Sequence, residues 1–418
     1  MLQSIIQSSN RQKEYPIVNT YSVTDLYRVG DRRSVFPSVI WNDYRTFFAA
    51  NKENIGFNNK IQVFQKDHKF NSFHVKEAGQ GTDEFDEFNH PLTAIWEEND
   101  YIYCCQTNTH NDIIEVYKSN LKNDIRSGFT LINIIQGENA YPQIFKTVSG
   151  KTAFCVRQFP EGVGNFNLSV QLSDSGIEGT FTKIVITENT DGYRHYNIVP
   201  IKYGTSTKNF LFSCLRNDNA GNVYFSQAIY ETSDFDTYRN IDGSFSKTIS
   251  VSGELTMEEI STHCIVNGSI ANDTVNFEIA NVIQINDVLY FTSIKAGTSV
   301  RYIFKIENGL LESFVLNISN LFQIGRNPIL YSNGVNPIVS CITDDNGDKN
   351  REIWAVSSDC SFFSQQFIWE GITGSNHIFL PDNFDKVRGE YEMLVEVNPS
   401  NSTLKTVTNT NRFLLWKL

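Results

Sequence analysis

The chain has 418 residues, a formal net charge of −12 and an isoelectric point near 5.1, which argues against a basic duplex-binding surface and predicts no nucleic-acid partner. It holds 31 Phe and 18 Tyr, and 40% of its residues are apolar, which favours half-buried β-strands around a sizeable core. No apolar run approaches the roughly 18 residues that span a bilayer, so we expect no membrane insertion.

The first element in chain order is residues 1–15, which we expect to be a separate N-terminal segment able to act as an anchor. This segment, MLQSIIQSSNRQKEY, shows neither the apolar core nor the small-residue cleavage site of a secretory signal. We therefore expect synthesis in the cytoplasm, with incorporation into a virion as one destination and secretion left open.

One sequence pattern then recurs about every fifty residues, the size of a four-stranded propeller blade. It consists of a Pro or an apolar pair, a short strand, a polar turn, a second strand, a variable loop and a third strand. Successive copies start at Phe36, His90, Tyr141, Tyr196, Ile279 and Asn327. The second strands (YIYCCQ, TAFCVRQ and FLFSCLRN, for example) are almost continuously apolar, as expected of strands covered on both faces.

The interval between the fourth and fifth copies is longer, and we interpret it as an insertion near residues 240–270, forming a loop or small hairpin. The C-terminal residues supply three strands, starting at His377, and the fourth is expected from residues 16–26. Joining both termini in one blade removes exposed sheet edges. We therefore predict an all-β fold, in which residues 16–418 form a single seven-bladed β-propeller closed by pairing of the N- and C-terminal strands. A β-helix or a jelly roll is the alternative.

The seven cysteines are odd in number and show no CxxC or HxxxH spacing, so we predict no metal site and no cofactor. We expect buried free thiols that pack as small apolar side chains. Cys104 and Cys105 are adjacent in one predicted strand, so they should lie on opposite faces of it.

Candidate functional residues lie where innermost strands begin, because these positions line the central funnel of a propeller. They are His90, Tyr141, Tyr196 with its neighbour His195, and Arg326. Loops after the second strands return to the same face and bring His110 and Arg157. Taken singly, a surface histidine can be merely solvated, Tyr141 can fill the space between blades, and Arg157 can pair with an acidic neighbour. Their joint occurrence is what favours a binding site.

Three segments, HPLTAIWEENDYIYCCQTNTH, YPQIFKTVSGKTAFCVRQ and HYNIVPIKYG, resemble the BNR-type β-propeller family that includes the ulvan lyases, over about residues 85–205. In that family a His opens one blade and a second His follows its second strand; a Tyr and an Arg follow in the next blade, and a Tyr opens the one after. The residues that match this order are His90, His110, Tyr141, Arg157 and Tyr196. The aspartate-box motif (SxDxGxxW) is present only in the degenerate form SDSGIEGTF, from Ser173.

The resemblance implies β-elimination on a uronate-containing glycan, with His90, His110, Arg157 and Tyr196 as catalytic residues. Arg157 would neutralise the uronate carboxylate through a bidentate pair. His90 or His110 would be the base, because histidine titrates near neutral pH, and Tyr196 would protonate the leaving group or serve as the base itself. The substrate-binding residues would be Tyr141, His195 and Arg326.

Two other functions remain open on the sequence, because one fold hosts many roles. The first is a non-catalytic glycan-binding propeller of a phage particle, such as a tail or head fibre or receptor-binding protein. The acidic, Asn-rich composition favours it, and residues 1–15 would then contact other virion proteins. The second is a propeller used only as a protein-interaction platform. The partner expected of the lyase and of the phage protein is an acidic polysaccharide or a cell-surface glycan.

Overall fold

In the computed structural model the described residues are 19–22, 27–28, 39–42, 45–52, 59–67, 72–82, 93–107, 113–136, 139–158, 167–188, 193–203, 206–219, 222–263, 266–271, 282–294, 300–319, 321, 328–332, 335–345, 348–369, 377–379, 392–397 and 412–417. They are almost entirely β-strands, which confirms the predicted class apart from two short helices. All strand pairs among these residues are antiparallel, unlike those of a parallel β-helix.

The described strands fall into seven sheets, numbered here along the chain. Sheet 1 holds β2 (Tyr27–Arg28), β3 (Val39–Asn42), β4 (Arg45–Lys52), β5 (Asn59–Asp67) and β6 (Ser72–Thr82). Sheet 2 holds β7 (Thr93–Glu98), β8 (Tyr101–Thr107), β9 (Ile113–Leu121) and β10 (Asp124–Gln136). Sheet 3 holds β11 (Asn139–Lys146), β12 (Thr152–Gln158), β13 (Asn167–Ser173) and β14 (Thr182–Val185).

Sheet 4 holds β15 (Tyr193–Tyr203), β16 (Ser206–Asn219), β17 (Asn222–Thr232), β18 (Thr237–Asn240), β19 (Ser246–Thr248) and β20 (Val266–Ala271). Sheet 5 holds β21 (Val282–Ile285), β22 (Val288–Ile294), β23 (Arg301–Glu307) and β24 (Leu310–Val315). Sheet 6 holds β25 (Ile329–Ser332), β26 (Pro337–Asp345), β27 (Asp348–Val356) and β28 (Phe363–Trp369). Sheet 7 holds β29 (His377–Phe379), β30 (Glu392–Val397), β31 (Arg412–Lys417) and, from the other end of the chain, β1 (Asn19–Ser22).

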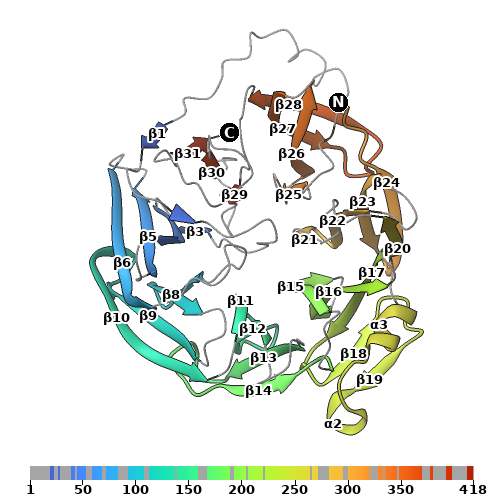
Figure 1. Ribbon diagram of the computed structural model, residues 1–418, viewed down its shortest axis with the longest axis horizontal. Coiled ribbons are helices and arrows are strands. Elements are labelled where there is room, and N and C mark those ends of the chain that lie inside the picture. The colour runs from blue at the N-terminus through green and yellow to red at the C-terminus, as the bar shows by residue number, and fades with distance from the viewer. Residues whose placement is uncertain are drawn as a thin grey trace.

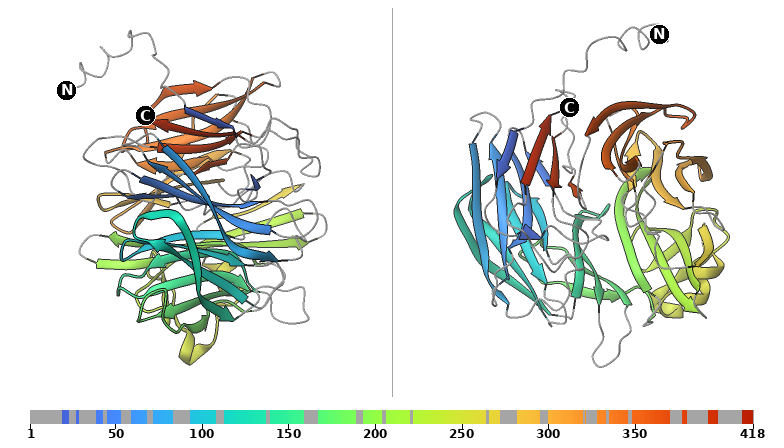
Figure 2. Two further views of the ribbon diagram at one scale, coloured as in Figure 1. Left: turned by 90° about the vertical axis from the view of Figure 1, so that its left-hand side faces the viewer. Right: turned by 45° about the horizontal axis from the view of Figure 1, so that its top comes forward.

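The sheets are arranged around a common centre like blades, with strands such as β11, β15, β21, β25 and β29 nearest to it (Figure 1). The turned views show the sheets standing side by side around this ring (Figure 2). In sheet 7, β1 pairs with β31 so that Asn19 lies opposite Leu415.

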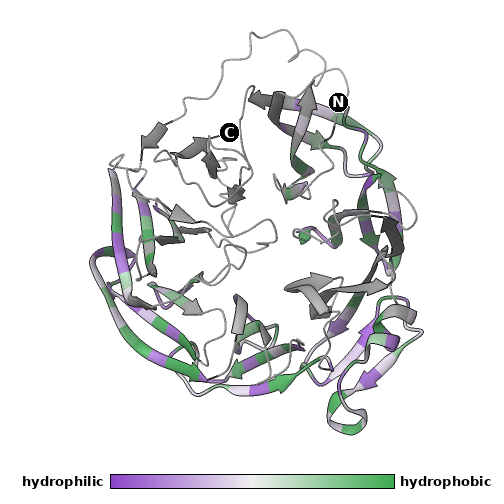
Figure 3. Cartoon of the chain, viewed as in Figure 1, coloured by the Kyte–Doolittle hydropathy of each residue, from purple (hydrophilic) through white to green (hydrophobic). Residues whose placement is uncertain are grey.

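The second strand of a sheet is buried on both faces, as its continuous apolar sequence indicates. In β12 every residue from Thr152 to Val156 is buried, and in β8 every residue from Ile102 to Cys105. Cys104 packs in the cluster between sheets 1 and 2, and Cys105 in the cluster between sheets 2 and 3, which confirms that they lie on opposite faces. The outer strands instead alternate hydrophilic and hydrophobic bands, as in β6 and β10 (Figure 3).

Three turns between third and fourth strands, in sheets 3, 4 and 6, share one backbone geometry. Each begins with a hydroxyl residue and has a positive φ three residues later: Ser173 and Gly176 (+81°), Thr232 and Phe235 (+63°), Ser357 and Cys360 (+58°). Phe235 and Cys360 tolerate this left-handed conformation because both side chains are almost fully buried. The degenerate aspartate box at Ser173 is thus one of a set of related turns.

In two of these turns an aspartate side chain accepts hydrogen bonds from N–H or hydroxyl groups of the turn itself. Asp234 Oδ1 accepts hydrogen bonds from the backbone N–H groups of Asp236 and Thr237 at 2.9 Å. Asp359 Oδ1 accepts from the hydroxyls of Ser357 and Ser361 and from the backbone N–H of Ser361, and these bonds lower the pKa of Asp359 to about 2. The sequence alone does not identify TSDF, from Thr232, and SSDC, from Ser357, as turns of this kind. In both, Phe or Cys stands at the left-handed position, where glycine is favoured.

The interval between β17 and β20 holds more structure than a loop or hairpin. After β18 and β19 come α2 (Ile249–Ser252), which projects from the edge of the ring, and α3 (Met257–Thr262) (Figure 1). β17 pairs with β20 along its first half and with β18 near its end, so this segment is an excursion within the fourth strand of sheet 4. We call residues 237–262 the excursion. Thr256 and Glu259 form a capping box on α3, a sequence signal that the loop interpretation overlooked.

In the described part of the chain, neither helix has the length or the apolar character needed to cross a bilayer.

Candidate functional site

Four of the predicted site residues lie in described strands of two neighbouring sheets. Tyr141 is in β11 and Arg157 in β12 of sheet 3, while His195 and Tyr196 are in β15 of sheet 4. His90, His110 and Arg326 lie outside the described residues.

The end of sheet 3 that carries Tyr141 and Arg157 has an irregular register. Ala140 lies opposite Arg157, but the next pair is Gln143 with Cys155, so β11 has one residue more than β12 in this interval. Pro142 falls inside the bulge and lacks the N–H that a regular ladder requires. The bulge therefore follows from the sequence, and it places the backbones of Tyr141 and Arg157 at the same end of the sheet.

The start of β15 repeats this arrangement in sheet 4. Tyr193 lies opposite Leu215 and His195 opposite Cys214, so the register shifts here as well. His195 is the third residue of β15, as Tyr141 is of β11, and Tyr196 follows it. β11 and β15 are neighbouring innermost strands (Figure 1). The structure therefore places these four predicted residues in two neighbouring sheets, each with a distorted first strand.

His90 and His110 can be located only by their distance along the sequence from the described strands of sheet 2. Thr93, the first residue of β7, lies opposite Gln106 of β8. His90 precedes Thr93 by three residues, and His110 follows the last residue of β8, Thr107, by three. Both histidines thus flank the same end of the β7–β8 pair along the chain.

At the opposite ends of β7 and β11, a buried carboxylate joins sheets 2 and 3. The Glu98 side chain is only 8% exposed, and it forms an ion pair with Lys146 at the end of β11. Its Oε2 accepts a hydrogen bond of 2.8 Å from the backbone N–H of Ile177, and Oε1 accepts one of 3.3 Å from the Thr152 hydroxyl. The Glu98 carboxylate thus has an ion-pair partner and two hydrogen-bond donors, so we assign this cluster a structural role.

A tyrosine hydroxyl ties the same two sheets together nearer the outside. Tyr103 Oη donates to Glu178 Oε1 at 2.7 Å, and Lys118 Nζ lies 2.6 Å from the same oxygen. The hydrogen bonds from Lys118 and Tyr103 lower the pKa of Glu178, while burial and the neighbouring Glu178 raise the pKa of Tyr103. Tyr290 in sheet 5 makes a related contact, donating to the carbonyl oxygen of Ser358 in sheet 6 at 2.9 Å. These tyrosines remain protonated and hold adjacent sheets together.

The described residues provide no cluster of three or more His, Cys, Asp or Glu side chains able to hold a metal ion. Cys104, Cys105, Cys155 and Cys360 are buried and form no disulfide. Burial raises the pKa of Cys105 to about 12 and raises that of Cys155 well above its usual range, so neither is an activated nucleophile.

Comparison with known proteins relates the chain to others through its fold. No protein-family model matches the sequence, and no curated protein matches it. Among solved structures, an ulvan lyase of polysaccharide lyase family PL25 superposes with a TM-score of 0.60 and 12% identity over 96% of this chain and 95% of its own. The same enzyme bound to -[GlcA(1-4)Rha3S]- gives a TM-score of 0.61 and 12% identity, over 97% and 96% of the two chains. The polysaccharide lyase Uly1 gives 0.60 and 10% identity, over 96% and 99%.

Proposed function

We propose that the chain is a polysaccharide lyase that cleaves a uronate-containing glycan by β-elimination at the central end of sheets 2 to 4. The scaffold in this proposal is a seven-bladed propeller of residues 16–418, closed by the β1–β31 pair. The proposed separate N-terminal segment, residues 1–15, lies outside the described residues, and the insertion near 240–270 corresponds to the excursion from sheet 4. The fold similarity to polysaccharide lyases supports this scaffold. Because one fold hosts many functions, the reaction is argued from the residues of the candidate site.

One observation carries the proposal: two adjacent innermost strands, β11 and β15, are distorted where the predicted substrate-binding and catalytic residues lie. Bulges occur preferentially beside active sites, where they change the direction of a side chain. Arg157 pairs with Ala140, beside the bulge of β11, and Tyr196 lies beside the irregularity of β15. An arginine and a tyrosine from neighbouring sheets can supply two of the groups that β-elimination needs, a cation and a proton donor or base.

The reaction itself defines the roles. A base removes the proton from the carbon α to the uronate carboxylate, and the electron pair forms a double bond to the adjacent carbon. The glycosidic C–O bond at that carbon breaks, and an acid protonates the departing oxygen. The negative charge that builds up on the carboxylate during proton removal needs a fixed cation.

In this scheme Arg157 binds the carboxylate through its planar guanidinium, which suits a bidentate pair. His90 or His110 is the base, with Tyr196 as the acid, or Tyr196 takes the base role itself. Tyr141, His195 and Arg326 hold the sugar rings on either side of the cleaved bond.

The experiment is an ultraviolet assay for unsaturated uronate, run on a panel of acidic polysaccharides. We expect absorbance to rise with the wild type and the rate to fall by roughly a hundredfold or more in Arg157→Ala, as for other lost charge-stabilising groups. Arg126→Ala is the matched control, because this arginine pairs with Asp124 on β10 and its side chain is 55% exposed. Its rate should equal that of the wild type.

A flat trace for every polymer, from folded wild-type protein, would overturn the proposed reaction. Binding of one polymer without cleavage would then point to glycan recognition alone. The fold comparisons add no support for a virion protein, so we advance no second function.

A further inference from the structure

The excursion from sheet 4 is also attached to the edge of sheet 3. Leu255, between α2 and α3, forms a parallel bridge with Thr187 just beyond β14. Its backbone N–H donates to the carbonyl oxygen of Ile186 at 2.9 Å, and its carbonyl oxygen accepts from the N–H of Glu188 at 3.0 Å. The excursion therefore extends the edge of sheet 3 with a short strand-like segment.

The start of α3 is held by Glu188 of sheet 3 and by side chains of the excursion itself. Glu188 Oε1 of sheet 3 accepts a hydrogen bond of 2.6 Å from the backbone N–H of Met257, the first residue of the helix. Within the excursion, Thr256 Oγ1 accepts from the N–H of Glu259, and Glu259 Oε2 accepts from the N–H of Thr256. These bonds satisfy N–H groups that a helix start leaves without partners.

Lys247 on β19 secures the other side of this segment. Its Nζ donates to the carbonyl oxygen of Glu254 at 2.6 Å and lies 2.7 Å from Glu259 Oε2, and its side chain is only 8% exposed. Lys247 is paired with Tyr238 of β18, which continues the hairpin from β17. A continuous path of contacts thus runs from sheet 4 through Lys247 and Glu259 to the edge of sheet 3.

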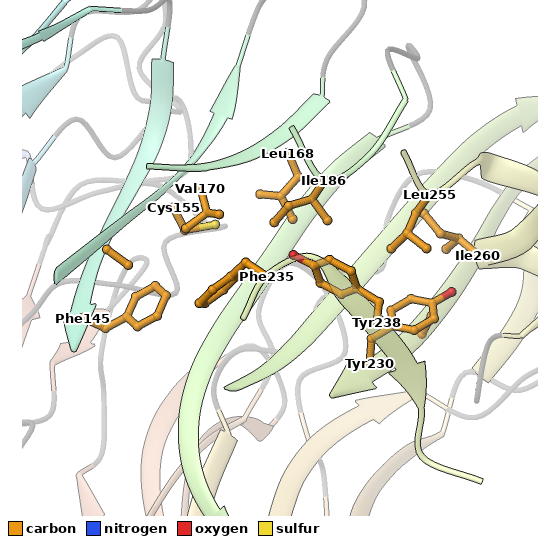
Figure 4. Packing of buried hydrophobic residues seen from close by; sticks show 12 residues of the cluster. Phe145, Cys155, Leu168, Val170, Ile186, Tyr230, Phe235, Tyr238, Leu255 and Ile260 are labelled. Carbon is orange, nitrogen blue, oxygen red and sulfur yellow. The ribbon is translucent and has the colours of Figure 1, made fainter. Parts of the chain in front are cut away.

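A single buried cluster fills the space between the two sheets and the excursion (Figure 4). Sheet 3 contributes side chains including Leu168 and Cys155, sheet 4 contributes Ala228 and Tyr230, and the excursion contributes Leu255 with Ile260. α3 also lies against β16 and β17.

The cluster reaches the direct strand neighbours of two proposed catalytic residues. Leu168 is the cross-strand partner of Arg157. Ala228 is the partner of Ser213, which is in turn the partner of Tyr196. The same packed core therefore lies behind both residues, one strand away in sheet 3 and two strands away in sheet 4.

We propose that the excursion is a positioning element that fixes sheet 3 relative to sheet 4 and thereby sets the spacing between Arg157 and Tyr196. This inference rests on the proposed lyase function for its catalytic consequence, while its structural part stands independently. Lys247 and Glu188 are positioning residues in this scheme, since each acts through the segment around Leu255. Small errors in the placement of reacting groups reduce turnover strongly even when the substrate still binds.

The test compares the variants Lys247→Met and Glu188→Ala with Tyr290→Phe. The last removes a hydroxyl that joins sheets 5 and 6, an inter-sheet hydrogen bond in which the excursion takes no part. All are assayed well below their unfolding temperatures, so that each is fully folded. In Lys247→Met and Glu188→Ala we expect kcat to fall about tenfold, with KM within about twofold of the wild type. Tyr290→Phe should leave both constants unchanged. Lys247→Arg should restore kcat, because it keeps the positive charge. Values of kcat within twofold of the wild type in both Lys247→Met and Glu188→Ala would overturn the positioning role.

A second measurement does not depend on catalysis. Spin labels on cysteines introduced at Lys183 of β14 and Ser233 after β17, both exposed, report the distance between sheets 3 and 4. We expect a broader distance distribution in Lys247→Met than in the otherwise unchanged labelled chain. A distance distribution as narrow as that of the labelled chain with Lys247 intact would overturn the positioning role of the excursion. Inactivity of the wild type on every glycan would count against the proposed function alone.

Discussion

Leu255 and Ile186 are joined by a backbone hydrogen bond of 2.9 Å, and both side chains are fully buried in one cluster. The bond connects the excursion from sheet 4 to the last residues of sheet 3. It also covers part of an edge strand, which otherwise presents unpaired N–H and C=O groups to other chains. The excursion thus covers part of the edge of sheet 3 and joins sheets 3 and 4.

The first prediction concerns the free energy of unfolding. Leu255→Ala removes a fully buried side chain and leaves a cavity among residues of three elements, so we expect a loss of about 2–5 kcal/mol. Leu310→Ala is the control, because that leucine is 70% exposed and its loss should cost under about 0.5 kcal/mol. Denaturant unfolding measures both. Equal losses in the two variants would contradict the packing described here.

The second prediction concerns the pH dependence of the tie between sheets 2 and 3. Hydrogen bonds from Lys118 and Tyr103 lower the pKa of Glu178 in the folded chain. Such a group stabilises the fold above its unfolded pKa of about 4.3, and this contribution disappears as pH falls through the lower, folded pKa. Because the Glu178 side chain is 49% exposed, we expect Glu178→Gln to cost only about 0.5–1 kcal/mol at pH 7.

The Glu178→Gln difference should shrink as the solution is acidified below about pH 4. Denaturant unfolding of both proteins across this range measures it, with Lys122→Met as a variant of a fully surface ion pair for comparison. A difference that grows on acidification would be the wrong sign.

The third prediction separates backbone strain from side-chain crowding. Gly176 and Gly150 have φ values of +81° and +84°, so alanine is strained at either position by about 1 kcal/mol. At Gly176 an added Cβ would also lie 3.0 Å from Glu98 Oε2, whereas no atom lies within 4 Å of one at Gly150. Gly176→Ala should therefore lower the unfolding temperature more than Gly150→Ala, and the reverse order would contradict the position of Glu98.

The fourth prediction concerns thiol reactivity. Burial raises the pKa of Cys105 and Cys360 to about 12 and leaves Cys104 and Cys155 inaccessible. Since only the thiolate reacts, we expect no alkylation of these residues in the native protein at pH 8 and complete alkylation in denaturant. Peptide mass mapping distinguishes individual cysteines. Native labelling at Cys104 or Cys155 would show that the inter-sheet clusters open readily.

The sheets could be predicted because burial of a strand on both faces requires a continuous run of apolar residues in the sequence. The segments YIYCCQ and TAFCVRQ have no polar face, which is typical of strands covered on both sides. Their repetition indicated stacked four-stranded sheets. Within sheet 3, Pro142 carried a further local signal, since a proline inside a strand requires an interruption of the ladder.

The excursion was only partly predictable. Its length was visible in the spacing of the repeats, and TMEE contained the capping box of α3. The contact of Leu255 with Ile186 could not be read from the sequence, because it joins residues that are distant in the chain and depends on no local pattern. The left-handed turns at Phe235 and Cys360 could not be predicted for a similar reason, since burial in the tertiary structure offsets their local strain.

Local sequence pattern was sufficient to recognise the repeated strands and to place Tyr141, Arg157, His195 and Tyr196 at their ends. Periodicity and burial on two faces are properties of short segments, so they can be recognised without the fold. The tertiary structure was needed to show that β11 and β15 are neighbours, that the register of β15 also shifts near His195, and that one core lies behind these residues. These relationships depend on how separate sheets pack, and packing is set by contacts between residues far apart in the chain.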